Sequence, residues 1–193
     1  MKDVLKFKNL LILSIIILLS SCGQTIDLDD DGEYMEKKSK IIYYRGTPYT
    51  GKVVKYFDQD EKTRLQLKGF IKDGKEEGEI VKYYKNGELL EKVTWEDGNK
   101  NGGSESYYEN GQLKFKNNYK DGRNDGLHES YYDNGQLEDK INYKDGIYDG
   151  LYESYYENGQ LEYKRNYKDG KKDGLYESYY DNGQLEDKIN YKD

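Results

Sequence analysis

From residue 46 onward, polar corners separate short stretches in which apolar or aromatic residues alternate with polar ones, and this pattern repeats every 24 residues. Pairs of tyrosines lead into Asn-Gly corners, and Asp-Gly corners recur at the same interval from Asp73 to Asp169. The tyrosine pairs begin at Tyr83, Tyr107, Tyr131, Tyr155 and Tyr179. A fixed period of this length indicates a tandem array of small supersecondary units.

The composition of one unit predicts a β-hairpin. An Asn-Gly pair between alternating stretches is typical of a type I′ turn, which needs positive φ at both central residues. With Asn182-Gly183 as that turn, Glu177 faces Lys188 and Tyr179 faces Glu186 on one side of the hairpin. On the other side, Ser178 faces Asp187, Tyr176 faces Ile189 and Gly174 faces Tyr191.

Charge supports this register. The pairing of Glu177 with Lys188 recurs at the matching positions of three earlier units, as Glu153–Lys164, Glu129–Lys140 and Glu105–Lys116. Cross-strand pairs of opposite charge stabilise a sheet, and a slip of one residue would send every side chain to the wrong face. The turn and the charges therefore indicate the same alignment.

We expect an all-β fold in which tandem 24-residue β-hairpin repeats form an elongated, twisted, largely single-layer antiparallel sheet over residues 46–193. About six units, the first a looser one containing Tyr56-Phe57, would place roughly twelve strands over roughly 55–60 Å. Aliphatic residues are too few to fill the space between two layers. Several glycines in each unit, and the lack of a 3.6-residue apolar stripe, argue against helix.

The start of the chain predicts export. Residues 10–19 read LLILSIIILL and follow three lysines, which is typical of a secretory signal peptide and short for a membrane span. Residues 19–22, LSSC, resemble the bacterial lipobox. The resemblance implies a signal peptide over residues 1–21, cleavage after Ser21 and a lipid on Cys22, the chain's only cysteine. A plain secretory signal with an incidental cysteine is the alternative.

Residues 22–45 are polar and open with an acidic run, so we expect a solvated tether between lipid and array. The spacing of Asp27, Asp29, Asp31 and Gly32 matches the start of a calcium loop. The twelfth position of such a loop needs a bidentate glutamate, and here it is Lys38. The mismatch argues against a metal site.

Composition and charge narrow the classes of partner. The chain contains 23 tyrosines, which argues against disorder although 36% of its residues are charged. Its formal net charge is −7, and removal of residues 1–21 would make it −9 because that segment holds three lysines and one aspartate. So acidic a protein suits a basic or mixed-charge partner and argues against nucleic acid.

The sequence contains no recognisable set of catalytic residues. His128, the sole histidine, occupies the repeat position of Tyr152 and Tyr176 and is interpreted as a substituted aromatic residue. No serine or cysteine nucleophile is arrayed with it, and the glycines recur at hairpin spacing instead of phosphate-loop spacing. A pair of carboxylates acting as in glycosidases is left open as an alternative. We predict no enzyme activity and no cofactor.

The repeating unit resembles the bacterial MORN-type variant repeat, and in particular the arrays of the YwqK-like antitoxin family. The resemblance lies in the recurring G-x-x-x-x-Y-Y-x-N-G-x-L followed by Y-x-D-G, over about residues 46–193. It implies strings of β-hairpins that associate with proteins and, in some cases, with membranes, and it implies no catalysis.

These observations favour a non-enzymatic lipoprotein of the bacterial cell envelope, on the outer membrane if the cell has two membranes, whose array is a protein–protein interaction scaffold. Its partners would be the membrane, through the lipid on Cys22, and an unidentified protein. The alternatives are an antitoxin or immunity protein that neutralises a toxin, and binding to cell-wall glycan or a membrane surface. The candidate binding surface is aromatic, although covering of the sheet's own backbone explains the same residues. It comprises Tyr107, Tyr131, Tyr155, Tyr179 and Trp95.

Overall fold

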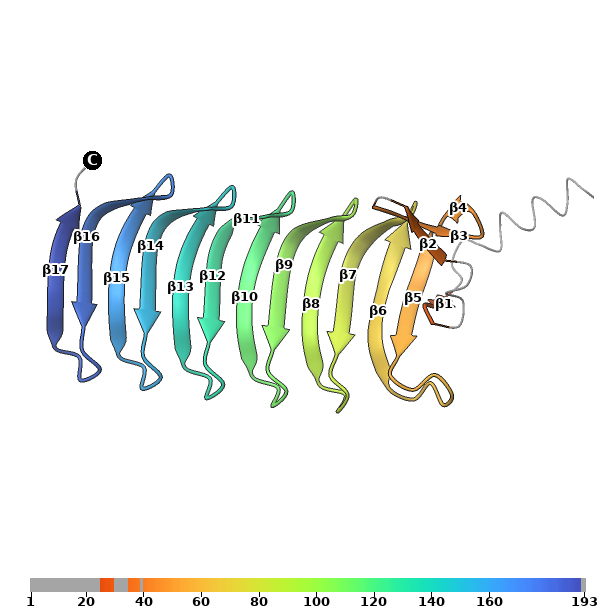
Figure 1. Ribbon diagram of the computed structural model, residues 1–193, viewed down its shortest axis with the longest axis horizontal. Coiled ribbons are helices and arrows are strands. Elements are labelled where there is room, and N and C mark those ends of the chain that lie inside the picture. The colour runs from red at the N-terminus through yellow and green to blue at the C-terminus, as the bar shows by residue number, and fades with distance from the viewer. Residues whose placement is uncertain (1–24, 30–34, 39, 192–193) are drawn as a thin grey trace, which may run out of the picture.

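In the computed structural model, the chain forms one long sheet of hairpins placed side by side, with a small second sheet at its N-terminal end (Figure 1). The structure describes residues 25–29, 35–38 and 40–191. The small sheet contains β2 (Met35–Lys38), β3 (Ile41–Tyr44) and β4 (Thr47–Pro48). The long sheet contains β1 (Thr25–Asp27), β5 (Gly51–Tyr56), β6 (Leu65–Lys72), β7 (Lys75–Tyr83), β8 (Leu89–Glu96), β9 (Asn99–Tyr107), β10 (Leu113–Lys120), β11 (Arg123–Asn124), β12 (Gly126–Tyr131), β13 (Leu137–Lys144), β14 (Ile147–Tyr155), β15 (Leu161–Lys168), β16 (Lys171–Tyr179) and β17 (Leu185–Tyr191).

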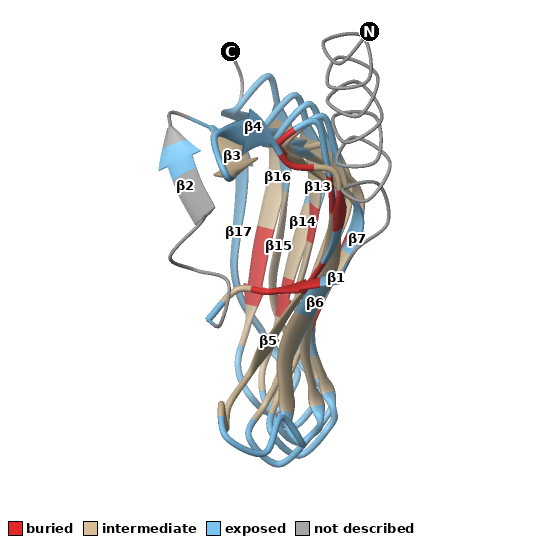
Figure 2. Ribbon diagram, turned by 90° about the vertical axis from the view of Figure 1, so that its right-hand side faces the viewer, coloured by how far each residue is buried: buried red, intermediate tan, exposed pale blue. Residues whose placement is uncertain are grey.

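The long sheet has 14 strands, and from β5 to β17 every neighbouring pair is antiparallel and follows the order of the chain. Only β1 joins in parallel, beside β5. Seen along the array, the hairpins overlie one another as one curved layer (Figure 2). The all-β, elongated, antiparallel array predicted from the 24-residue period is confirmed.

The turn at each Asn-Gly corner differs from the prediction. In the last unit the amide of Tyr180 donates to the carbonyl of Gln184, and the amide of Gly183 donates to the carbonyl of Tyr180, both at 2.8 Å. Gly183 has φ +82°, whereas Asn182 is not among the residues with positive φ. The loop is therefore a three-residue one with glycine in the left-handed region, and the expected type I′ turn at Asn182-Gly183 is wrong.

A β-bulge restores the predicted register inside the hairpin. The longer loop pairs Tyr179 with Leu185, so the predicted contact of Tyr179 with Glu186 is wrong. Glu186 is the extra residue of the bulge, and beyond it Ser178 pairs with Asp187 and Glu177 with Lys188, as the charges indicate. The same shift recurs in the earlier units, for example between Ser154 and Tyr155.

The Asp-Gly corners are where type I′ turns form. Asp169 and Gly170 both have positive φ, +47° and +80°, and the strands on either side pair through Lys168 and Lys171. Two consecutive residues of positive φ between paired strands define this turn, which matches the twist of the strands. Type I′ turns therefore join one unit to the next, and the Asn-Gly loops close each unit.

The N-terminal end holds the cluster of buried hydrophobic side chains. Ile26, Tyr49, Val53 and Ile71 pack together there, and Ile26 is fully buried. The small sheet is fastened to the array through Gly74, whose carbonyl accepts from the amide of Ile42 at 2.7 Å. A Cβ at Gly74 would lie 2.7 Å from the carbonyl oxygen of Ile42, so only glycine permits this approach. We expected a solvated tether over residues 22–45, but the described residues of that segment form the strands β1, β2 and β3, and Ile26 packs in the core.

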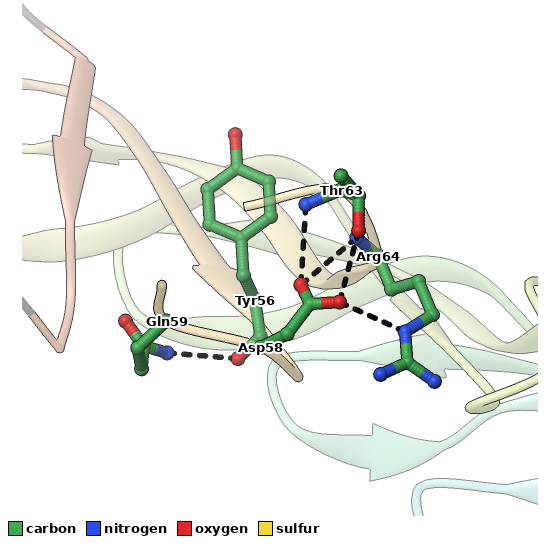
Figure 3. Close-up of polar contacts among 5 residues, drawn as sticks. All are labelled: Tyr56, Asp58, Gln59, Thr63 and Arg64. Carbon is green, nitrogen blue, oxygen red and sulfur yellow. Dashed lines mark hydrogen bonds and ion pairs between the residues drawn. The ribbon is translucent and has the colours of Figure 1, made fainter. Parts of the chain in front are cut away.

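The first hairpin, between β5 and β6, has a longer loop held by one carboxylate (Figure 3). Asp58 accepts hydrogen bonds from the amide and hydroxyl of Thr63 and from the amide and Nε of Arg64, at 2.9–3.2 Å. The Arg64 hydrogen bonds hold the pKa of Asp58 well below its usual range. This network fixes the three or so extra residues that distinguish the first unit from the others.

Candidate interaction surface

The register divides the side chains of the array between two faces of the sheet. One face carries an uninterrupted row in which lysine and glutamate alternate from strand to strand, and we call it the charged face. The row runs through Lys92, Glu105, Lys116, Glu129, Lys140, Glu153, Lys164, Glu177 and Lys188. The opposite face, which we call the aromatic face, carries Trp95, Phe115, His128, Tyr143, Tyr148, Tyr152, Tyr163, Tyr167 and Tyr176.

Ion pairs along the charged face extend the predicted cross-strand contacts. Glu177 contacts Lys188 within its own hairpin and Lys164 of the preceding unit, both at 2.8 Å. Hydrogen bonds from these two lysines and from a tyrosine lower the pKa of Glu177 to about 2. The row therefore joins neighbouring units as well as the two strands of each hairpin.

Rings on the aromatic face form a continuous network. Phe115 stacks on His128, whose ring meets Tyr143 edge-on, and Tyr143 lies 5.1 Å from Tyr148 between centroids. The network continues to Tyr176 through Tyr152, Tyr163 and Tyr167, with neighbouring centroids 5.0–6.4 Å apart. Each of these rings is half-buried against its neighbours, because the described residues form no second layer over this face.

Arg165 lies inside this network. Its guanidinium carbon is 4.5 Å from the centroid of Tyr163, 5.1 Å from that of Tyr176 and 6.0 Å from that of Tyr152. Such cation–π contacts hold the planar side chain against the sheet. The combination of several rings and one cation makes this the most distinctive part of the aromatic face.

His128 occupies an aromatic position, as predicted. Its ring packs between Phe115 and Tyr143, and burial lowers the pKa of the imidazole below its ordinary value. These ring contacts make His128 a packing residue of the network.

The predicted binding residues fall on both faces. Tyr107, Tyr131, Tyr155 and Tyr179 lie on the charged face, and the hydroxyl of Tyr107 donates to Glu105 at 2.8 Å. Burial raises the pKa of the Tyr107 hydroxyl. Trp95 lies on the aromatic face, in the repeat position of Tyr143 and Tyr167. The structure does not bring the five together as one surface, and binding by any of them stays a prediction.

The second tyrosine of each pair has a role that the sequence reasoning missed. The hydroxyls of Tyr84, Tyr108, Tyr132 and Tyr156 each donate to the backbone carbonyl of a residue 23 positions later, at 2.7–2.9 Å. The corner asparagines do the same, as when Asn134 Nδ2 donates to the carbonyl of Glu157 at 3.1 Å. We call the tyrosine bonds the inter-unit clamps. Their signal in the sequence is that the second tyrosine and the asparagine recur in every one of these units.

A pocket of about 440 Å³ lies near the first loops of the array. Its lining includes Phe57, Leu67 and Leu90, with Lys82 and Lys85 among the charged residues. Later units carry lysine or glutamate at the repeat position of Leu90, so the pocket depends on a departure from the repeat.

Other candidate chemistry gains no support. The described residues contain no group of three or more His, Cys, Asp or Glu side chains that could hold a metal ion. Of the proposed calcium-loop residues, Asp27 pairs with Lys62 and Asp29 with Lys55, while Asp31 and Gly32 lie outside the described residues. Cys22 and the signal segment also lie outside them. In the part of the chain that the structure describes, we find no helix with the length and hydropathy that a bilayer crossing needs.

Comparison with known families agrees with the geometry. No curated protein matches this chain. The profile of the MORN repeat variant matches residues 76–97, 100–121, 124–145, 148–169 and 172–193, which together make up more than half of the chain. Repeats of this family are commonly protein- or membrane-interaction modules and are generally non-enzymatic. The five matched units fall on the hairpins from β7 to β17, and the chain belongs to the MORN repeat variant family.

Proposed function

We propose that this protein is a non-enzymatic scaffold for protein–protein interaction at the bacterial cell envelope, held there by a lipid on Cys22, and that it binds its partner through the aromatic face. The observation that carries the proposal is the continuous ring network from Phe115 to Tyr176, on a face that no second layer of described residues covers. Tyrosine offers a large, rigid contact area at a low cost in conformational entropy. Family membership supports an interaction role.

Capture from native envelopes tests the aromatic face. The variant Tyr152→Ser with Tyr176→Ser removes two rings and introduces the residue that Ser104 already supplies at the same repeat position. The control variant is Leu151→Glu with Leu175→Glu, which changes two apolar residues on the charged face to the residue found at Glu79. We expect the tyrosine variant to lose the partner and the leucine variant to keep it. Equal capture by both variants would exclude the aromatic face.

The lipid is tested separately. Cells fed an alkyne-bearing fatty acid should label the wild-type protein, and the Cys22→Ala variant should stay unlabelled and leave the membrane fraction. Labelling of the variant would contradict lipidation at Cys22.

Glycan binding is the second candidate function, because half-buried aromatic rings on an open face also suit stacking on sugars. Sedimentation with purified cell wall, using the same pair of variants, distinguishes this role from protein capture. The antitoxin role is an outcome of the capture itself, since it requires the recovered partner to be a toxin.

A further inference from the structure

Arg165 is a half-buried cation on the aromatic face. Its Nη1 lies 3.5 Å from the hydroxyl of Tyr167, and its Nε is buried with no hydrogen-bond partner. In the described part of the chain, no carboxylate forms an ion pair with it, and rings surround it instead. A half-buried guanidinium that has lost part of its hydration gains from a carboxylate, which it can bind through two parallel hydrogen bonds.

Comparison between units shows that this arrangement is particular to one of them. Among the five units that match the family, the repeat position of Arg165 carries Val93, Asn117, Ile141 and Ile189 in the four others. Two residues earlier, Tyr163 stands where three of the four other units have an acidic residue. Those residues are Glu91, Asp139 and Asp187. The unit that gained the arginine therefore carries tyrosine where an acidic neighbour would otherwise stand.

The guanidinium favours an acidic ligand, and the surrounding rings provide contact area for it. Tyr152, Tyr163 and Tyr176 lie around the guanidinium with neighbouring centroids 5.3–6.3 Å apart, so a carboxylate that reached Arg165 would be flanked by aromatic walls. Low exposure to water strengthens an ion pair formed there. The net charge of −7 acts at long range and would slow the approach of a strongly acidic partner. One acidic side chain in a partner of mixed charge fits both conditions.

We propose that Arg165, surrounded by Tyr152, Tyr163 and Tyr176, binds the carboxylate of an aspartate or glutamate side chain of the partner protein. The proposal rests on the scaffold function proposed above and specifies its recognition element. Arg165 is the specificity-determining residue, and the tyrosines supply the contact area.

Selection from a random twelve-residue peptide library displayed on phage tests this without knowledge of the natural partner. The full chain is immobilised, and selection is run in parallel on wild type and on Arg165→Ile, the residue found at Ile141 and Ile189. We expect wild-type binders to be enriched in one acidic position and the variant's binders to lack that enrichment. The Tyr152→Ser with Tyr176→Ser variant identifies the binders that use the aromatic face.

Matched peptides then measure the contact. Replacing the selected glutamate by glutamine should weaken binding to wild type about tenfold or more, and should change binding to Arg165→Ile little. Arg165→Lys keeps the charge but loses the planar guanidinium, so we expect it to bind the glutamate peptide almost as weakly as Arg165→Ile does. Circular dichroism and the melting temperature should be those of wild type for Arg165→Ile, since sister units fold with isoleucine.

The outcomes separate the two proposals. Binders that need the tyrosines but show no acidic position, or tolerate glutamine, would overturn carboxylate recognition and leave the scaffold role standing. Failure to select any binder that needs the tyrosines would overturn both. Binding of anionic phospholipid vesicles through Arg165, with no acidic peptide bound, would assign the arginine to a membrane surface and overturn the proposal.

Discussion

Replacing Tyr132 by phenylalanine removes one inter-unit clamp and nothing else. The hydroxyl of Tyr132 donates to the carbonyl of Tyr155 at 2.8 Å, across the boundary between two units. Phenylalanine keeps the ring and its packing, so the change in the free energy of unfolding reports the hydrogen bond. A net intramolecular hydrogen bond contributes about 0.5–1.5 kcal/mol, and we expect a loss of about 1 kcal/mol.

The array supplies its own control for this substitution. Tyr180 is the same residue in the last described unit, and its side chain is 49% exposed. It makes no hydroxyl hydrogen bond to a later unit within the described residues, so Tyr180→Phe should change stability by less than about 0.5 kcal/mol. Equilibrium unfolding in urea, followed by circular dichroism, measures both variants.

Combining the four clamp substitutions enlarges the effect. Phenylalanine at Tyr84, Tyr108, Tyr132 and Tyr156 should cost about 2–6 kcal/mol if the clamps act independently. Because stability in a repeat array is held by interfaces between neighbouring units, we also expect a broader transition. If Tyr132→Phe and Tyr180→Phe have the same effect, the clamp does not stabilise the array and the reasoning fails.

Three further predictions concern single positions. Gly150→Ala should destabilise the protein by about 1–3 kcal/mol, because Gly150 has φ +112° and an added Cβ would lie 3.3 Å from Asn142. Gly103 is the control: its φ is not positive and no atom lies within 4 Å of an added Cβ, so Gly103→Ala should leave the urea midpoint of unfolding almost unchanged. The pKa of Glu177 is depressed in the folded state, so its contribution to stability is present above about pH 4.5 and is lost as the pH falls toward 2. The melting temperature of wild type should therefore fall more over that range than that of Glu177→Gln, and parallel curves would contradict the ion-pair account. Asp58→Asn keeps the size of the side chain but removes the negative charge that pairs with Arg64. Proteolysis of the loop between β5 and β6 should therefore become faster. An unchanged rate of proteolysis would show that the loop does not depend on the carboxylate.

The register could be predicted from the sequence, but the turn type could not. Glu177 and Lys188 recur at fixed spacing, and only one alignment pairs them in every unit. The Asn-Gly loop adopts a different turn because its asparagine side chain has other partners. Asn158 Oδ1 accepts from the amide of Gln160, and its Nδ2 donates to the carbonyl of Asp181 in the next unit. The contact with Asp181 forms only between stacked units, whereas the contact with Gln160 is local and recurs in the last unit, where Asn182 Oδ1 accepts from the amide of Gln184. The Asn-Gly pair alone does not distinguish this three-residue loop from a type I′ turn.

The candidate surface was harder to predict for a related reason. Alternation shows that Tyr176 and Tyr179 lie on opposite faces, but it does not show which face carries a connected set of rings. That depends on contacts between units, such as the one between Tyr163 and Tyr176. Arg165 did carry a signal, because it departs from the repeat. The strand at Thr25–Asp27 was not predicted, because the acidic residues after Ile26 made the segment look like a solvated linker. Ile26 nevertheless packs into the core.

Some positions of the repeat unit are the same in every one of the last five units and others vary, and this division explains how a single-layer sheet can combine stability with specific recognition. Positions that do not vary among the last five units hold the array together, as the clamp tyrosines and the lysines of the charged face do. The central row of the aromatic face varies from unit to unit, as Ile80, Ser104, His128, Tyr152 and Tyr176 show. Because the backbone is held from the loops and from the opposite face, a change in that row alters the surface without removing a clamp or an ion pair. Specificity can therefore change one unit at a time, and the unit that contains Arg165 is where we expect it to lie.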